Sequence, residues 1–148
     1  MVNMPPRGVF LVGRLHPSSS PSPASSSPPP SWLPPKQESR LLATASISFD
    51  PISRDTFQTL RPPDHEAYLC NIAVDPKFRR RGIARKMLVA CEELTKSRGF
   101  RTLYLHVRMG DEGARALYES SGFVEVDSDS WLVKLRGMTP STLMVKSL

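Results

Sequence analysis

Acidic residues are missing from the start of this 148-residue chain, since no Asp or Glu occurs among residues 1–37. The same segment consists largely of Ser and Pro. A segment with so few apolar side chains cannot offset the entropy lost on ordering. The sequence therefore predicts a disordered segment over 1–40, one folded core over 41–136 and a C-terminal tail over 137–148.

Cysteine and histidine are also scarce. The two cysteines, Cys70 and Cys91, fall in strand-like and helix-like runs, which favours buried, reduced thiols over the alternative of a disulfide. The three histidines are scattered along the chain, so no metal site is expected. No run of about 18 apolar residues occurs, so no membrane-spanning helix is expected either.

The acid-poor start has two interpretations. Ser-rich, Arg-containing, acid-poor N-termini are typical of organelle transit peptides, and Arg7 and Arg14 lie in this segment. The plastid interpretation is favoured, and the alternative is a simple Pro/Ser-rich linker in a cytoplasmic protein.

Positive charge is present in excess, with a net charge of +6 and a pI of about 9.7. Six basic residues lie within ten positions: Lys77, Arg79, Arg80, Arg81, Arg85 and Lys86. Such a cluster suits nucleic acid, a membrane surface or a phosphorylated cofactor. Nucleic acid is the weaker candidate, because the basic residues lack interleaved aromatics and a known docking motif.

Hydrophobic periodicity predicts the order of the elements. Strands are expected at 41–49, 67–74 and 102–107, helices at 83–98 and 114–121, and a hairpin of 123–126 with 131–135. The central order of strand, basic loop, helix and strand is a right-handed βαβ unit with two parallel strands. Ligands bind such units beyond the carboxyl ends of the strands, at the N-terminus of the helix.

The loop Arg79-Arg80-Arg81-Gly82-Ile83-Ala84 opens the first predicted helix. Gly82 allows the backbone to approach a ligand closely, and the free amides of the first helical turn carry partial positive charge. These amides can hold a pyrophosphate through charged hydrogen bonds of roughly 1.5–3 kcal/mol each. On this hexapeptide alone, a solvated basic turn before an ordinary helix is the alternative.

Two motifs together resemble the GNAT superfamily of N-acetyltransferases. The signature Gln/Arg-x-x-Gly-x-Gly/Ala is matched by Arg79, Gly82 and Ala84. A second signature, Asn-x-x-Ala-x-x-Leu-Tyr-x-x-x-Gly-Phe, is matched at Asp111, Ala114, Leu117, Tyr118, Gly122 and Phe123. The resemblance covers residues 41–136 and is closest to the branch that acetylates protein N-termini, including ribosomal-protein acetylases. It also includes plant plastid enzymes, which adds to the prediction of a plastid location.

The resemblance implies an α/β (α+β) fold with a GNAT-like mixed sheet around the βαβ unit. It also implies acetyl-CoA as cosubstrate and a protein α-amine or lysine as acceptor. The residues implied in cofactor binding are Ile72, Ala73, Val74, Arg79, Arg80, Arg81, Gly82, Ile83, Ala84, Arg85, Asp111 and Ala114. Asp111 departs from the family's Asn, and an ionised acid donates no hydrogen bond and repels phosphate.

Three residues are implied in catalysis. Tyr118 occupies the family's usual position for the acid that protonates the leaving thiolate. His106 occupies the position of the base, and Tyr68 lies at the matching place on the preceding strand, where some members pair a Tyr with that His around an ordered water. A histidine titrates near neutrality and can serve as a base.

The chain departs from the family ahead of residue 41, where members have a strand and two helices. The Pro/Ser-rich segment cannot supply those helices, so the chain resembles an N-terminally truncated member. The outer edge of the strand at 41–49 is then expected to have no partner. A working acetyltransferase and an acyl-CoA-binding form with little turnover are both compatible with this sequence.

Overall fold

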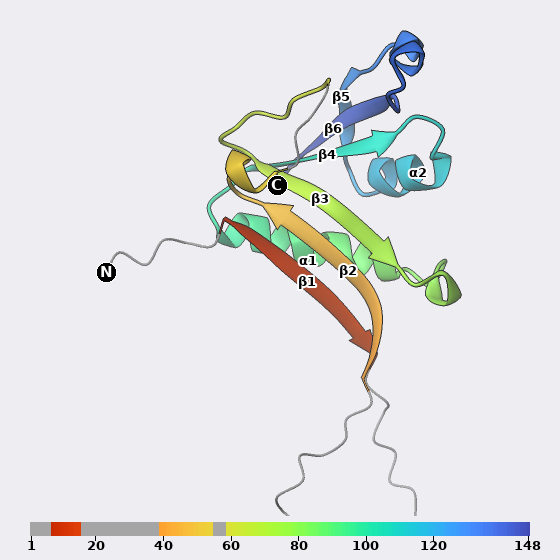
Figure 1. Cartoon of the computed structure of the whole chain (residues 1–148). Helices are drawn as coiled ribbons and strands as arrows, with labels where there is room; N and C mark the ends of the chain where they lie inside the picture. Colours follow the sequence, from red (N-terminus) through yellow and green to blue (C-terminus); the bar gives the residue numbers. More distant parts are fainter. Residues whose placement is uncertain (1–6, 16–38, 55–58) are drawn as a thin grey trace, which may run out of the picture.

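The structure is a computed structural model that describes residues 7–15, 39–54 and 59–148. Six strands form one mixed sheet in the order β1-β2-β3-β4-β6-β5. They are Gly8–Leu15 (β1), Arg40–Ser48 (β2), Ala67–Val74 (β3), Thr102–Arg108 (β4), Val124–Ser128 (β5) and Ser141–Ser147 (β6). All neighbouring pairs are antiparallel except β3 and β4, which are parallel. Figure 1 shows these two central strands starting together and diverging toward their C-terminal ends.

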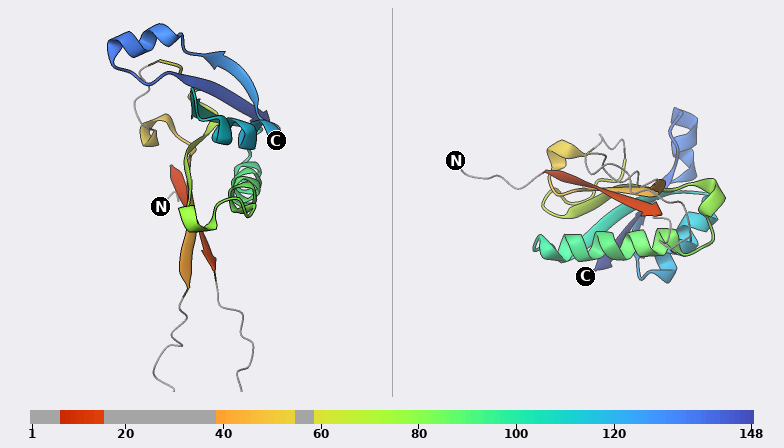
Figure 2. Two further views of the ribbon diagram at one scale, coloured as in Figure 1. Left: turned by 90° about the vertical axis from the view of Figure 1, so that its right-hand side faces the viewer. Right: turned by 90° about the horizontal axis from the view of Figure 1, so that it is seen from below.

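Two α-helices cover one face of the sheet. Helix α1 (Ile83–Ser97) connects β3 to β4, and the shorter α2 (Glu112–Ser120) follows β4. The short 3-10 helix η1 (Pro51–Ser53) lies on the opposite face, as the turned views in Figure 2 show. One face of the sheet is therefore packed by α1 and α2, while η1 lies on the other (Figure 2).

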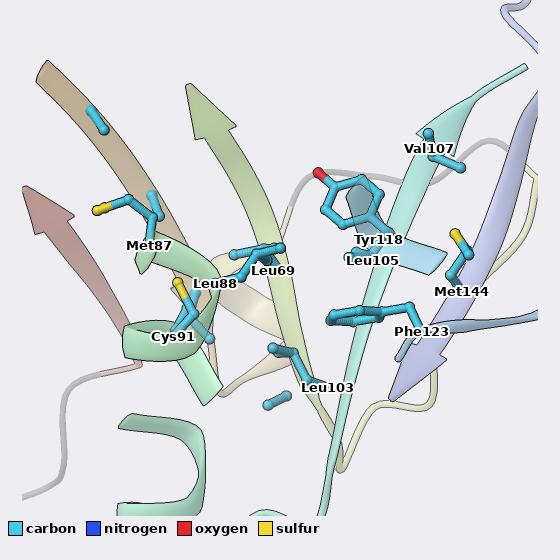
Figure 3. Close-up of a cluster of buried hydrophobic side chains, with 14 residues drawn as sticks. Leu69, Met87, Leu88, Cys91, Leu103, Leu105, Val107, Tyr118, Phe123 and Met144 are labelled. Carbon is cyan, nitrogen blue, oxygen red and sulfur yellow. The ribbon is translucent and has the colours of Figure 1, made fainter. Parts of the chain in front are cut away.

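The core lies between the helices and the sheet. Leu88 and Cys91 of α1 are fully buried because they recur on one side of the helix and face Leu69 and Leu103 of the central strands. A second part of the core surrounds Tyr118, and its side chains are labelled in Figure 3. Each fully buried large aliphatic side chain contributes about 1.5–3 kcal/mol of stabilisation.

The predicted central elements are confirmed. The structure places β2, β3, α1, β4 and α2 within two residues of the ranges expected from periodicity. The parallel pairing of β3 with β4 is confirmed by the register that joins Ala67 to Leu103 and Leu69 to Leu105.

The prediction that residues 1–40 are disordered, and that the edge of β2 is uncovered, is wrong for the described part of that segment. Residues Gly8–Leu15 form β1 and pair along β2 from Gly8–Ser48 to Leu15–Arg40. The physical reason is that this run contains no proline, pairs along β2 and carries Leu11 inward against the core. The rest of the expected disordered segment, residues 1–6 and 16–38, lies outside the described residues.

The predicted hairpin near the C-terminus is also wrong. Residues Trp131–Arg136 form a 3-10 helix, η3, in which the Ser130 side chain accepts a hydrogen bond from the Leu132 backbone. The partner of β5 is β6, which lies in the segment expected to be a tail. Strand β6 occupies a place between β4 and β5 because Thr142, Leu143 and Met144 are all buried there.

The cysteine prediction is half right. Neither thiol forms a disulfide, and Cys91 is buried, but Cys70 is exposed. The register between β2 and β3 shifts from Ser46–Asn71 to Ile47–Leu69, which leaves Cys70 as the extra residue of a β-bulge. A bulge redirects its extra side chain away from the ladder, and this explains the exposure.

Candidate active site

The site begins where the two parallel strands separate. Strands β3 and β4 pair only from Ala67–Leu103 to Leu69–Leu105. Beyond Leu69, β3 continues paired with β2 alone among the described strands. The backbone of Ile72–Val74 therefore has one edge available for an extended ligand in the gap.

A pocket of about 590 Å³ lies beside this gap, a size in the usual range for small-molecule sites. All the residues expected to bind the cofactor line it, except Arg81. The further lining residues are Phe78, Gly113, Leu117 and Tyr118. Folding thus brings together β3, the basic loop, the start of α1 and the start of α2.

The N-terminus of α1 is open to a ligand. Its N-cap is Gly82, which has a left-handed backbone (φ 75°) and provides no capping side chain, and none of the described side chains caps this end. The first-turn amides therefore point into the pocket region without a side-chain acceptor. Such a helix end attracts anions through both its free donors and its dipole.

The basic loop is held by contacts to β2 and β3. The guanidinium of Arg40 lies 4.7 Å from the centroid of the Phe78 ring, and that of Arg81 lies 5.2 Å from it. Arg79 donates from Nε to the Val74 carbonyl at 3.2 Å, and Arg40 pairs with Asp75 at 3.2 Å. Arg81 is therefore placed against Phe78 and does not line the pocket.

Asp111 has a structural role that the sequence did not reveal. It is the N-cap of α2, and its Oδ1 accepts a hydrogen bond from the Ala114 backbone N–H at 3.0 Å. Asp is a favoured N-cap residue, so the departure from the family's Asn preserves the cap. Asp111 still lines the pocket, where its charge stands near the expected phosphate groups.

Tyr118 lies deep in the pocket. The ring is buried and packs edge-on against Phe123, with centroids 5.8 Å apart. In Figure 3 it lies between β3 and β4, with its hydroxyl turned toward β3. Burial, with a smaller contribution from the charges of Asp111 and Cys91, raises the pKa of Tyr118 to about 12. The hydroxyl therefore keeps its proton at neutral pH.

Tyr68 and His106 meet on the opposite face of the sheet. The Tyr68 hydroxyl lies 2.9 Å from Nδ1 of His106, so the two residues make a direct hydrogen bond, whereas the resemblance implied a pairing around an ordered water. The other imidazole nitrogen, Nε2, lies 3.1 Å from the Leu60 carbonyl oxygen. Burial lowers the pKa of His106, although the bond to Leu60 and the charge of Asp129 oppose this change. The imidazole is therefore neutral at physiological pH and able to accept a proton.

Several residues near this pair were not identified from the sequence. The Arg54 guanidinium lies 5.8 Å from the centroid of the Tyr68 ring and donates to the carbonyls of Pro63 and Glu66. Asp129 interacts electrostatically with His106. Neither residue belongs to a recognisable motif, and both reach the site from loops, so the sequence carried no signal for them.

The described part of the chain holds no group of three or more His, Cys, Asp or Glu side chains arranged to bind a metal ion. None of its helices has the length and apolar character needed to cross a membrane.

Comparison with known proteins identifies the family. The model of the Acetyltransferase (GNAT) family matches residues 13–123. The chain is 39% identical over 88 residues to GCN5-related N-acetyltransferase 5, chloroplastic, from Arabidopsis thaliana, covering 59% of this chain and 28% of that protein. It is 52% identical over 60 residues to the [ribosomal protein bS18]-alanine N-acetyltransferase of Salmonella typhimurium, covering 40% of each chain.

A solved structure shows the same fold. The ribosomal-protein-S18-alanine N-acetyltransferase of Escherichia coli superposes with a TM-score of 0.53 and 29% identity, covering 72% of this chain and 61% of that one. The chain spans less than half the length of each of these two curated relatives. Because the family model covers the βαβ unit, the basic loop and the second signature, this chain belongs to the GNAT family of acetyltransferases.

Proposed function

We propose that the chain is an acetyl-CoA-dependent N-acetyltransferase that acts on the α-amine of a protein or on a lysine amine. One observation carries the proposal. The pocket at the open N-terminus of α1 adjoins the gap between β3 and β4, with Tyr118 on one side of the sheet and the Tyr68–His106 pair on the other.

The chain's own groups suit each part of acetyl-CoA. The amides from Arg80 to Arg85 and the dipole of α1 would hold the pyrophosphate. The available backbone edge of Ile72–Val74 would pair with the amide groups of the pantetheine arm. The thioester supplies an activated acetyl group, and the gap between the strands would bring it within reach of the opposite face.

Two proton transfers are needed for acetyl transfer, and the site has a candidate for each. The Tyr68–His106 pair would remove a proton from the acceptor amine, which then attacks the thioester carbonyl. Tyr118 would donate a proton to the thiolate that leaves when the carbon–sulfur bond breaks. Each such transfer contributes typically about 10²–10⁴ in rate.

The second candidate is an acyl-CoA-binding protein with little turnover. It is favoured by the acceptor side of the site, because the described residues before β3 form two strands of the sheet and the short η1 but no α-helix. Without a wall to hold the amine, the entropic advantage of positioning, which is worth several kcal/mol, would be reduced. Acetyl-CoA binding would be retained under this alternative, because the pocket is lined by β3, the basic loop, α1 and α2 and not by a wall on the acceptor side.

Incubation with labelled acetyl-CoA and a mixed peptide library tests the proposal. We expect label on peptide α-amines or lysines, with the modified position identified by mass spectrometry. Binding of acetyl-CoA in a thermal-shift assay without any labelled peptide would favour the second candidate. Absence of both binding and transfer in the folded protein would eliminate both.

Two locations, plastid and cytoplasm, were open from the sequence, and we propose the plastid. The acid-poor N-terminus and the chloroplastic Arabidopsis relative support it. Strand β1 restricts where a plastid transit peptide could be cleaved, because cleavage after residue 40 would remove an edge strand of the sheet. A fluorescent fusion of residues 1–40 that stays in the cytosol would contradict a plastid leader in this segment.

A further inference from the structure

Asp129 is a buried carboxylate for which the proposed mechanism has no role. Only 8% of its surface is exposed. Its Oδ2 accepts three hydrogen bonds: from the Ser141 backbone N–H at 2.8 Å, from the Ser141 hydroxyl at 3.1 Å and from the Thr59 hydroxyl at 3.2 Å. Burial alone would raise the pKa of Asp129, but these bonds and the nearby His106 outweigh it and lower the pKa. Asp129 is therefore a fixed negative charge.

The hydrogen bonds of His106 determine which nitrogen carries the proton. A carbonyl oxygen can only accept, so Nε2 must donate to the Leu60 carbonyl 3.1 Å away. In a neutral imidazole, Nδ1 is then the acceptor. The hydroxyl of Tyr68, 2.9 Å from Nδ1, must therefore be the donor in this pair.

A short backbone segment, Thr59 and Leu60, connects Asp129 to the hydrogen bonds of His106. Thr59, which bonds Asp129, directly precedes Leu60, whose carbonyl receives the Nε2 proton of His106. Asp129 is in turn fastened to β6 through Ser141. The carboxylate thus anchors the same backbone that fixes the tautomer of His106.

The charges around the pair match a proton transfer from Tyr68 to His106. As the Tyr68 proton leaves, negative charge develops on Tyr68, over whose ring the Arg54 guanidinium lies, and His106 becomes an imidazolium, which interacts with Asp129. Within the described residues, Asp64, Cys70 and Asp50 also interact electrostatically with Arg54. Opposite charges at short range favour the charged form of each partner.

We propose that Asp129 is a positioning residue that holds His106 as the proton acceptor of Tyr68, so that the Tyr68 oxygen takes the proton from the acceptor amine. This inference rests on the proposed acetyltransferase function. A nitrogen–hydrogen bond of the ammonium breaks, and the electron pair stays on nitrogen. The proton moves to the Tyr68 oxygen as the Tyr68 proton moves to Nδ1, so the positive charge ends on His106 beside Asp129. His106 later releases that proton to solvent.

Asp129→Asn in the full chain tests the proposal by NMR titration of the His106 imidazole. We expect the wild-type protein to show the tautomer protonated at Nε2. The variant should lower the pKa of His106, because it removes the charge that favours the imidazolium. The acidic limb of kcat/KM should move to lower pH, and the plateau should fall about tenfold, which corresponds to one pKa unit of base strength.

Asp127→Asn is the matched control. It removes the same charge from exposed Asp127 in β5, whose side chain accepts from the Ser128 backbone at 2.8 Å. The control should leave the His106 pKa and the pH profile as in the wild type. Asp129→Glu, which keeps the charge, should hold the His106 pKa close to the wild-type value.

Protonation of wild-type His106 at Nδ1, or an unchanged His106 pKa in Asp129→Asn, would overturn the role of Asp129. The tautomer is measured in the wild type, so it decides the point even when Asp129→Asn does not fold. The NMR readouts also need no acceptor. Expected NMR results without acetyl transfer to any peptide would count against the proposed function and not against the coupling of Asp129 to His106.

Discussion

Gly82 is the residue at which the proposed cofactor binding can be tested most directly. We predict that Gly82→Glu abolishes acetyl-CoA binding, because a carboxylate at the open end of α1 would repel the pyrophosphate and occupy its place. Gly99→Glu is a matched control at the other end of the same helix. Both glycines have a positive φ, 75° and 85°, and neither has a heavy atom within 4 Å of an added Cβ.

Calorimetric titration with acetyl-CoA checks this pair of variants. Both carry similar backbone strain, so only the effect at the pocket distinguishes them. Gly99→Glu should bind as the wild type does. Wild-type affinity in a folded Gly82→Glu protein would show that the loop does not hold the phosphates.

His106 is expected to limit turnover and its pH dependence. His106→Ala should reduce turnover by about 10²-fold or more, while acetyl-CoA affinity stays nearly unchanged, because the imidazole lies across the sheet from the pocket. In the wild type, activity needs the neutral imidazole. Because burial lowers its pKa, kcat/KM should fall only when the pH drops below the ordinary histidine value. Full activity of His106→Ala from mildly acidic to mildly basic pH would make His106 structural.

The proposed role of Tyr118 as general acid can be tested without changing the shape of its ring. Tyr118→Phe removes the hydroxyl and keeps the ring that packs 5.8 Å from Phe123. We predict a decrease in turnover of about 10²-fold, the lower end of general-acid contributions. Acetyl-CoA affinity and Tm should change little. Unchanged turnover in steady-state kinetics would assign Tyr118 to packing alone.

At the scale of elements, β1 is the strand whose contribution can be measured most cleanly. Neighbouring side chains point to opposite faces, so Leu11 packs against the core while Phe10 is 81% exposed. Leu11→Ala should cost about 1–2 kcal/mol of unfolding free energy, less than for a fully buried leucine. Phe10→Ala should stay within about 0.5 kcal/mol of the wild type.

Urea unfolding of the two variants provides the measurement. Their chemistry is similar and their positions are adjacent, so the difference reports the packing of β1 on the core. Equal stabilities for Leu11→Ala and the wild type would mean that β1 does not cover the sheet in solution.

For the whole molecule, acetyl-CoA is expected to stabilise the fold by binding only the native state. A ligand at 100 times its Kd contributes about 2.7 kcal/mol, which corresponds to a rise in Tm of about 5–10 °C for a chain of this size. The pocket draws its lining from β3, α1 and α2, so the native arrangement of all three is needed for binding. Differential scanning fluorimetry with increasing acetyl-CoA measures the shift, and the Gly82→Glu variant should show none.

The central part of the fold could be predicted because its signals are local. The alternation in 67–74 and 102–107 and the helical period after Gly82 are determined by nearest neighbours, and the two signatures add fixed spacings. The edges could not be predicted in the same way. The segment at Gly8–Leu15 is short and surrounded by proline and serine, and only its pairing with β2 makes it a strand.

By itself, the sequence determined the βαβ unit, the basic loop before α1 and most of the residues that line the pocket, because these depend on contiguous motifs. Tertiary structure alone decided that β6 inserts between β4 and β5 and that Cys70 forms a bulge. It also decided that Arg54 and Asp129 flank the Tyr68–His106 pair. These outcomes depend on contacts between residues far apart in the chain, such as Thr59 with Asp129, which no local pattern encodes.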